Sequence, residues 1–394
     1  MISRLNLFWL FIALALNSAL LIFSMSGLSI SYYEAQIYYS NSNLGFILRY
    51  ISSIFGNNEI VIRGLFLTLH IANSLLIYII SLRILKRQSD CVIAAILYMF
   101  LPGVLVNALI INQASIAIFI TLIVVFLQQR QMYILISLIL ALSLFFSKPF
   151  IALYLAIMLF GLFSRDKKFA IIGAFFCIAW YYLNGLESSG KPRGYFLDSI
   201  AVFAAVFSPL LFIYFIYTIY RICIKEIKSF LWFIGLTALG VCLLLSMRQR
   251  VELELFLPFC VILVPAMVRT FFSSYRSRLP RFRVLYKLIC IIVLATLALN
   301  SLAIIFHQYL YIFLDNPKNH FAYKYDIAKE LAKALKDRHI TAISTNPNLA
   351  LRLKFYGISM GGNYYLDTTY KKSCEQIQIY KFNKSIANFY LCKK

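Results

Sequence analysis

One acidic side chain, Glu34, stands directly after a long apolar segment, in the run Ser31-Tyr32-Tyr33-Glu34-Ala35-Gln36. The chain is 62% hydrophobic and has only 15 Asp and Glu among its 394 residues, so an acidic residue beside such a segment is unusual in this chain. An ionisable residue at a membrane boundary is energetically costly unless it is paired or used in function. We therefore take Glu34 as the candidate general base of an enzyme that acts on a lipid-linked substrate at the outer face of a membrane.

Transfer of a group from a lipid phosphate also needs cations that hold the phosphate as it leaves and a site that excludes water. Arginine binds phosphate through two parallel hydrogen bonds, whereas lysine acts more as a point charge. Several basic residues fall in the loops that would share the outer face with Glu34. These candidates are Arg49, Arg63, Lys148, Arg193, Arg248 and Arg250.

Most of these cations also have a structural interpretation that the sequence leaves open. Arg49 and Arg193 suit ordinary interfacial or loop charges. Lys148 lies among apolar residues in the stretch 145–150 and suits a lysine whose stem is buried while its charge reaches the interface. Arg248 and Arg250 lie at a span boundary with Glu252 and Glu254. The alternative for these two arginines is ion pairing with the two glutamates.

A mean hydropathy of +0.80 and a charged fraction of 13% exclude an ordinary soluble domain, in which about 25% of residues are charged. The apolar residues come in repeated blocks of about 20, the length that crosses a bilayer. The first block, Leu7 to Leu28, is too long for a signal peptide and predicts an uncleaved signal anchor. We predict about eleven spans, several of them short, which begin near Leu7, Val61, Cys91, Ile116, Met132, Phe150, Phe169, Ile200, Phe230, Leu255 and Leu288.

Lys and Arg predict the orientation, because the cytoplasmic loops of membrane proteins carry an excess of both. With a cytoplasmic N-terminus, the cytoplasmic segments contain seventeen basic residues and the short opposite loops contain seven. This predicts a multi-pass protein of the bacterial inner membrane with a periplasmic C-terminus. The net charge of +23 then reflects this bias and a basic tail, not a nucleic-acid partner, and it suits anionic membrane lipids.

Composition divides the chain into a transmembrane body, residues 1–306, and a small polar tail domain, residues 307–394. Two external loops of the body are long, 29–60 with Glu34 and 187–198. In the first loop, Leu44 to Phe55 predicts an amphipathic helix that lies in the membrane interface. The tail predicts α/β structure, with a helix over Tyr325 to Asp337, a strand over Ile340 to Ser344, a helix over Leu349 to Tyr356 and a turn at Gly361-Gly362.

The eight cysteines fall into two groups. Six lie in or beside apolar spans and suit small buried side chains. Cys374 and Cys392 bracket two strand-like runs of the tail, Gln376 to Phe382 and Ile386 to Leu391. A disulfide across the ends of a hairpin suits an oxidising compartment, and two free thiols are the alternative. No zinc or iron–sulfur spacing occurs, and no cofactor is predicted.

Four motifs of the body follow one another in a recognisable order. They are Tyr33-Glu34-Ala35 with Tyr38 and Tyr39 behind it, Arg63 at the head of the second span, the break Ser147-Lys148-Pro149, and Ser246-Met247-Arg248-Gln249-Arg250 with Pro258. With these motifs, roughly residues 1–300 resemble the GT-C superfamily of integral membrane glycosyltransferases. The resemblance is to the bacterial branch related to protein O-mannosyltransferases and lipid A aminoarabinose transferases. It implies an all-α polytopic membrane protein with a small α/β external C-terminal domain.

The resemblance implies a transferase that moves a sugar from a polyprenyl-phosphate donor to an envelope glycan, lipid or protein, such as lipopolysaccharide. Glu34 would be the base, and the donor phosphate would be held by Arg63, Lys148, Arg248 and Arg250. Further candidates for substrate binding are Tyr33, Tyr38, Asn112, Gln113 and Arg193.

Two departures from the family's pattern leave a second function open. The first loop of the family carries Asp-Glu-Ala, but Tyr33 replaces the first acid. The next external loop commonly carries a second Asp, but here Asn112 and Gln113 stand there, which suit either sugar binding or the end of a helix. A divalent cation would lack a partner carboxylate, so no metal is predicted. The alternative function is a non-catalytic membrane subunit that anchors or assists a partner enzyme of the envelope.

Overall fold

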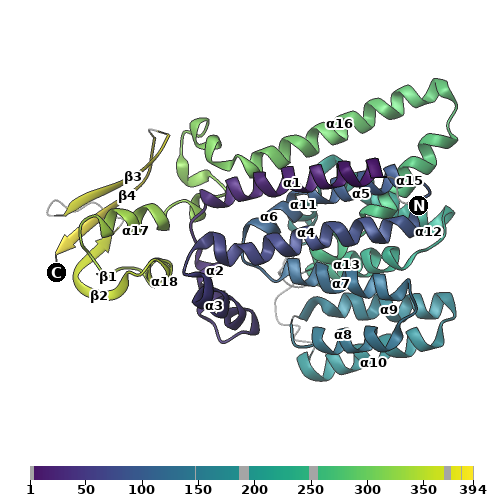
Figure 1. The fold of residues 1–394 in the computed structure, drawn as a ribbon, viewed down its shortest axis with the longest axis horizontal. Helices are drawn as coiled ribbons and strands as arrows, with labels where there is room; N and C mark the ends of the chain where they lie inside the picture. Colours follow the sequence, from purple (N-terminus) through teal and green to yellow (C-terminus); the bar gives the residue numbers. More distant parts are fainter. Residues whose placement is uncertain are drawn as a thin grey trace. The chain divides into compact units, whose positions relative to one another are not determined.

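The computed structural model describes residues 4–146, 148–185, 195–247, 256–367, 374–382 and 384–393. The chain forms two compact units. Figure 1 labels their helices and strands. The helical unit comprises residues 1–18, 66–108 and 112–301, and the mixed unit comprises residues 19–65, 109–111 and 302–394. The predicted boundary at residue 306 lies close to the end of the helical unit, but the mixed unit also contains the first loop with Glu34.

The helical unit consists of apolar helices, and their buried side chains form one large core. The ends of α1, α4, α6 and α16 extend into the mixed unit. The helices are α1 (Arg4–Ser26), α4 (Glu59–Ile84), α5 (Gln88–Met99), α6 (Pro102–Leu109), α7 (Ala114–Gln128), α8 (Tyr133–Ser143), η1 (Lys148–Phe150), α9 (Ile151–Ser164), α10 (Lys167–Asn184), α11 (Phe196–Phe207), α12 (Pro209–Lys225), α13 (Phe230–Ser246), α14 (Leu257–Val261), α15 (Val264–Ser277) and α16 (Pro280–Ile305).

The fold is that of a polytopic membrane protein, as predicted. In the part of the chain that the structure describes, four helical segments are long and apolar enough to cross a membrane, namely α1, α4, α14 with α15, and α16. The pairs α5 with α6 and α11 with α12 qualify only as bent spans, with angles of 59° and 104°. Each of the eleven predicted spans coincides with a helix or a bent pair. Length and composition nevertheless support only four to six full crossings among the described residues, because helices such as α7, α8, α9 and α13 are short.

Both bends occur where a proline begins the second helix. Pro102 is the first residue of α6, and Pro209 is the first residue of α12. The α region is disfavoured for the residue before a proline, so a helix usually ends there. Ser208 has a φ of 75°, which takes the chain out of helical geometry before α12 begins. The span predicted near Ile200 is therefore two short helices.

Helices α9 and α10 pack closely because each presents a glycine to the backbone of the other. A Cβ atom added to Gly161 would lie 2.4 Å from the backbone nitrogen of Ala170, and one added to Gly173 would lie 2.4 Å from that of Met158. Small residues allow such an approach between membrane helices, whose association is driven by close packing and not by the hydrophobic effect. A larger side chain at either glycine would push the two helices apart.

The first loop of the mixed unit contains two helices, α2 (Tyr32–Tyr39) and α3 (Asn43–Phe55). The helix predicted over Leu44 to Phe55 is confirmed as α3, and it is amphipathic. Leu44 and Leu48 are buried, whereas Phe46 and Tyr50 are 68% and 62% exposed. Ser42 caps the helix by accepting a hydrogen bond from the backbone of Gly45 at 3.1 Å. Location of α3 in the membrane interface stays a prediction.

The tail of the mixed unit is a small α/β domain with a four-stranded sheet in the order β1-β2-β4-β3. β1 runs parallel to β2, and the other neighbouring strands are antiparallel. Leu331 and Leu353 from two helices pack with Ile343 and Ile377 of the sheet to form the core. The elements are η3 (His307–Ile312), η4 (Pro317–Asn319), η5 (Tyr323–Tyr325), α17 (Ala328–Lys336), β1 (Ala342–Ser344), α18 (Pro347–Phe355), β2 (Ser359–Asp367), β3 (Glu375–Lys381) and β4 (Lys384–Lys393).

The predicted turn at Gly361-Gly362 is wrong, because both glycines lie inside β2. Their φ angles are 118° and 91°, which side chains other than glycine rarely adopt. Pairing with β1 is interrupted at this point, since Met360 is paired with Ile343 whereas Tyr365 is paired with the next residue of β1. The glycines therefore lie at an irregularity of the strand pairing and do not reverse the chain.

A disulfide joins Cys374 to Cys392 in the tail domain, with 4.5 Å between the two Cα atoms. The bond links the start of β3 to the end of β4, because Glu375 is paired with Leu391 in the antiparallel register. The other six cysteines are free.

Candidate functional site

The carboxylate of Glu34 is held at the N-terminus of α2 by a capping box. Ser31 precedes the helix, and its hydroxyl accepts a hydrogen bond from the backbone N–H of Glu34 at 3.3 Å. In return, Glu34 Oε2 accepts from the backbone N–H of Ser31 at 2.8 Å. This reciprocal pair satisfies two N–H groups that the helix leaves free. The local sequence therefore fixes the backbone of Glu34 before any long-range contact is made.

Arg63, in the first turns of α4, binds the same carboxylate through two hydrogen bonds. Arg63 Nε donates to Glu34 Oε1 at 3.1 Å, and Nη2 donates to Oε2 at 2.9 Å. The guanidinium also donates to the carbonyl oxygens of Leu28 and Ser29, at 2.9 and 3.0 Å. The side chains of Arg63 and Glu34 are only 1% and 2% exposed. The sequence singled out both residues for a phosphate-transfer site, and the structure brings them together as a buried ion pair.

A fourth N–H group completes the surroundings of Glu34. The backbone N–H of Ile111 donates to Glu34 Oε1 at 3.0 Å. Each carboxylate oxygen therefore accepts two hydrogen bonds, which matches the two lone pairs of each oxygen. A substrate hydroxyl must displace one of these donors before it can reach Glu34. A metal ion does not fit here for the same reason, and the described ranges contain no group of three or more His, Cys, Asp or Glu that could hold one.

Helix α18 of the tail domain fixes the residue just before the capping box. Tyr356 follows the helix, and its hydroxyl accepts from the backbone N–H of Ile30 at 3.0 Å and donates to Glu59 at 2.7 Å. Arg352, four residues earlier, donates from Nε to the carbonyl oxygen of Ile30 at 2.9 Å. Burial and the charge of Glu59 raise the pKa of Tyr356, so its hydroxyl stays protonated. Lys329 adds a cation 3.6 Å from Glu59.

Tyr38 and Arg49 connect α2 to α3 inside the mixed unit. The hydroxyl of Tyr38 lies 2.7 Å from Ser52 Oγ and donates to Asn57 at 3.0 Å. Arg49 donates to the backbone carbonyls of Tyr38 and Ser40 at the end of α2. These contacts favour a structural role for Arg49 over phosphate binding. Tyr33, by contrast, is 67% exposed.

Asn112 and Gln113 belong to the helical unit, at the start of α7. Asn112 Oδ1 accepts from the backbone N–H groups of Ala114 and Ser115, at 2.8 and 3.3 Å, so its side chain caps the helix. This is the helix-end role that the sequence left open. Gln113 makes no capping bond through its side chain. The predicted site residues Arg193, Arg248 and Arg250 lie outside the described residues, as does the side chain of Lys148.

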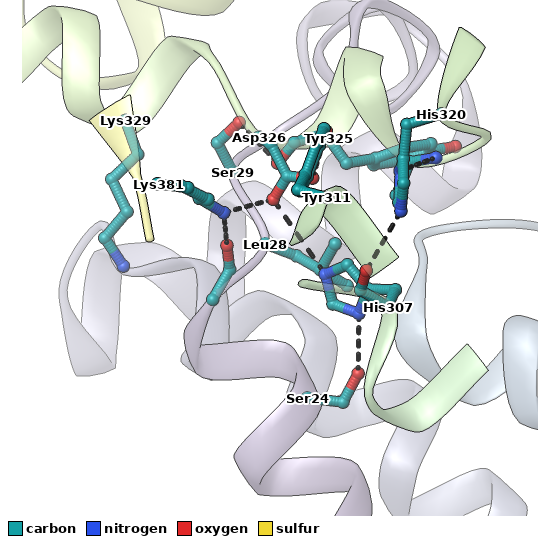
Figure 2. Close-up of polar contacts among 12 residues, drawn as sticks. Ser24, Leu28, Ser29, His307, Tyr311, His320, Tyr325, Asp326, Lys329 and Lys381 are labelled. Carbon is teal, nitrogen blue, oxygen red and sulfur yellow. Dashed lines mark hydrogen bonds and ion pairs between the residues drawn. The ribbon is translucent and has the colours of Figure 1, made fainter. Parts of the chain in front are cut away.

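A second buried polar cluster, which sequence reasoning missed, lies where α16 ends in the mixed unit (Figure 2). Asp326 accepts hydrogen bonds from Lys381 and, at 2.9 Å, from the hydroxyl of Tyr311. Lys381 also donates to the carbonyl oxygen of Gly27 at 3.2 Å. The Asp326 side chain is fully buried, so its ion pair with Lys381 compensates the cost of removing the carboxylate from water.

His307 faces the same carboxylate (Figure 2). Its Nδ1 lies 3.2 Å from the carbonyl oxygen of Ile304, which can only accept, so the neutral ring carries its proton on Nδ1. Nε2 then faces Asp326 Oδ1 at 3.9 Å and makes no hydrogen bond. Burial lowers the pKa of His307, the charge of Lys381 acts in the same direction, and Asp326 opposes both. The backbone carbonyl of His307 accepts from His320 at 2.9 Å.

Comparison with known proteins gives a structural likeness only. No family model matches the sequence, and none of the curated proteins matches it. Among solved structures, the chain is similar to the crystal structure of ArnT from Cupriavidus metallidurans in the apo state. The two share 10% sequence identity, and the match covers 97% of each chain with a TM-score of 0.61. The likeness shows that this chain has the fold of that structure.

Proposed function

We propose that the chain is a membrane glycosyltransferase of the GT-C type. It would move a sugar from a polyprenyl-phosphate donor to an envelope glycan, lipid or protein on the periplasmic face of a bacterial inner membrane. The observation that carries the proposal is the likeness to ArnT, which extends over 97% of both chains and so includes the tail domain as well as the helices. A fold hosts many functions, so the chemistry must come from the site.

In this proposal Glu34 is the general base. The acceptor hydroxyl would replace the N–H of Ile111, because that single backbone contact can be given up while Arg63 and Ser31 still hold the carboxylate. As the acceptor oxygen bonds to the sugar carbon, its proton passes to Glu34, and the bond from the sugar to the phosphate oxygen breaks. Arg63 donates four hydrogen bonds to Glu34 and two backbone carbonyls, so its part is to position the base.

The leaving phosphate then depends on the other predicted cations, Lys148, Arg248 and Arg250. Charge-assisted hydrogen bonds from such groups stabilise the negative charge that grows on the leaving oxygen. Tyr33 is exposed and can contact the substrate, and Arg193 and Gln113 are the further binding residues of this proposal, whereas the side chain of Asn112 caps α7.

The experiment that tests this function is mass spectrometry of envelope lipids and glycans from cells with and without the gene for this chain. A transferase predicts that one defined sugar increment disappears on deletion and returns when the chain is supplied again. Identical envelope profiles in the two strains would contradict a transferase, and the mass of a missing increment would identify the sugar that is transferred.

One observation favours the second function, a non-catalytic subunit that supports a partner enzyme. The carboxylate of Glu34 is buried and all four of its hydrogen-bond positions are filled, as expected for a residue kept for structure. That function predicts stable co-purification with a second envelope protein. A monodisperse preparation of this chain alone that transfers sugar would rule it out.

A further inference from the structure

A row of aromatic rings lies on the surface of the mixed unit. Phe23 contacts Phe306 with 5.9 Å between ring centroids, Phe306 contacts Tyr309 at 6.1 Å, and Tyr309 stacks on Phe382 at 5.0 Å. We call these four residues the aromatic ridge. Phe23, Tyr309 and Phe382 are 52%, 44% and 49% exposed, so much of the ridge is accessible to its surroundings.

Such an exposed aromatic surface is unfavourable in water. Large contiguous apolar patches are rare on surfaces that face only solvent and usually mark a contact with a membrane or another molecule. Ile312 and Phe313, which follow Tyr309 in the chain, are also exposed, by 56% and 82%. The ridge therefore requires an apolar or amphipathic partner.

The chain itself indicates which partner this is. Phe23 lies in the last turn of α1, and Phe306 is the residue directly after the end of α16. Both helices are long and apolar enough to cross a membrane. The ridge thus begins at the ends of two such helices, and tyrosine, the residue type of Tyr309, is enriched at the level where helices leave the apolar layer of a bilayer. Phe382, between β3 and β4, is held at the same level by its stacking on Tyr309.

Polar contacts anchor this part of the tail domain to the ends of the same helices. Lys381, next to Phe382, binds Asp326 and the carbonyl oxygen of Gly27 just after α1. Lys384 donates to the carbonyl oxygen of Leu314, in the segment that follows η3. The end of β3 and the start of β4 are therefore each anchored by a lysine beside the ridge.

We propose that the aromatic ridge lies in the headgroup layer of the membrane and that phospholipid covers it. The tail domain then contacts the bilayer directly, through Phe382, in addition to its covalent link to α16. Tyr309 suits this layer because its ring contacts acyl chains while its hydroxyl remains hydrated, and the three phenylalanine rings beside it contact the acyl chains. This inference is independent of the proposed function.

The test places a photoreactive side chain in the ridge of the full-length protein. Phe382→p-benzoylphenylalanine and, separately, Tyr309→p-benzoylphenylalanine keep an aromatic ring at the site. The matched control is Met360→p-benzoylphenylalanine, because Met360 is an exposed apolar residue of the same domain that does not belong to the ridge. It lies in β2 and is 66% exposed. Each variant is reconstituted in vesicles of phosphatidylethanolamine and phosphatidylglycerol, irradiated and analysed by intact-mass spectrometry.

We expect a mass increment of one phospholipid at positions 382 and 309 and none at position 360. Equal phospholipid adducts at all three positions would overturn the inference, because contact would then be non-specific. Absence of adducts at both ridge positions would also overturn it. A covalent dimer in place of the lipid adduct would overturn it in favour of a second copy of this chain. Two independent ridge positions keep the test valid if one variant fails to fold.

Discussion

Replacement of Glu34 by glutamine should destabilise the protein strongly, since it leaves the guanidinium of Arg63 buried without its charge partner. The two side chains are 2% and 1% exposed, so water cannot screen the remaining charge. Removal of one partner from a buried ion pair costs about 3–5 kcal/mol. In addition, the new NH2 group would face one of the N–H donors that now bind the carboxylate. We therefore expect Glu34→Gln to lower the free energy of unfolding by about 3–5 kcal/mol.

The assay is denaturant unfolding of the purified full-length protein in mild detergent, with a matched control. Glu375→Gln is the same chemical change in an ion pair with Arg338, but those side chains are 58% and 35% exposed. An exposed pair contributes about 0–1 kcal/mol, so this control should change little. An equal, small effect of Glu34→Gln and Glu375→Gln would refute the description of the buried pair.

A double variant provides a second check on the same reasoning. Glu34→Gln combined with Arg63→Gln leaves no uncompensated charge, so it should be more stable than Glu34→Gln alone. Interaction energies between residues in direct contact are about 0.5–3 kcal/mol in double-mutant cycles. Simple addition of the two single effects would mean that the two residues do not act as a pair.

Three further predictions concern the tail domain. Burial keeps the pKa of His307 below its ordinary value of 6.5 in the folded protein. As the medium becomes acidic, the histidine of the unfolded state is therefore protonated first, and this favours unfolding. Stability should thus be retained above pH 6.5 and fall below it. In thermal unfolding between about pH 7.5 and 5.5, the unfolding temperature of His307→Gln should decline less than that of the wild type. Tyr356→Phe deprives Ile30 and Glu59 of a partner and should cost about 1–3 kcal/mol, with faster amide exchange around residue 30. Tyr380→Phe is its control, because that hydroxyl contacts only its own strand. Replacement of Cys374 and Cys392 by serine opens a loop with a sequence separation of 18 and should lower the free energy of unfolding by about 3 kcal/mol in denaturant titration.

The sequence identified Glu34 and Arg63 individually but could not show how they meet. Both stood out because a charge beside an apolar segment needs compensation. They are 29 positions apart, and no spacing rule predicts which cation an isolated acid will bind. The capping box from Ser31 to Glu34 was visible as a serine three residues before a glutamate, and it would have indicated that the carboxylate has a structural contact.

The buried cluster around Asp326 carried no comparable signal. His307, Asp326 and Lys381 are separated by long stretches of the tail, and each is an ordinary residue in a polar segment. Only the folded chain brings them together, through a side-chain contact that local periodicity does not encode. The amphipathic pattern of α17 was predictable because its apolar residues recur with the helical period.

Hydropathy located the apolar helices but could not determine how many cross the membrane. Mean hydropathy over a window does not register a single break, so the predicted span near Ile200 hid the bend at Ser208. In the same way, Gly361 and Gly362 predicted a turn because glycine marks both turns and bulges. Only the partner strand distinguishes the two cases, and that information lies elsewhere in the chain.

The most direct test of the central claim compares envelope lipids and glycans by mass spectrometry in a deletion strain supplied with either of two proteins. One is the wild-type chain and the other is the double variant Glu34→Gln/Arg63→Gln, whose folding is verified by denaturant unfolding. If Glu34 is the base of a glycosyltransferase, the wild type restores one defined sugar increment and the folded double variant does not. Restoration of the increment by both proteins would contradict the role of Glu34, and restoration by neither would contradict the transferase itself.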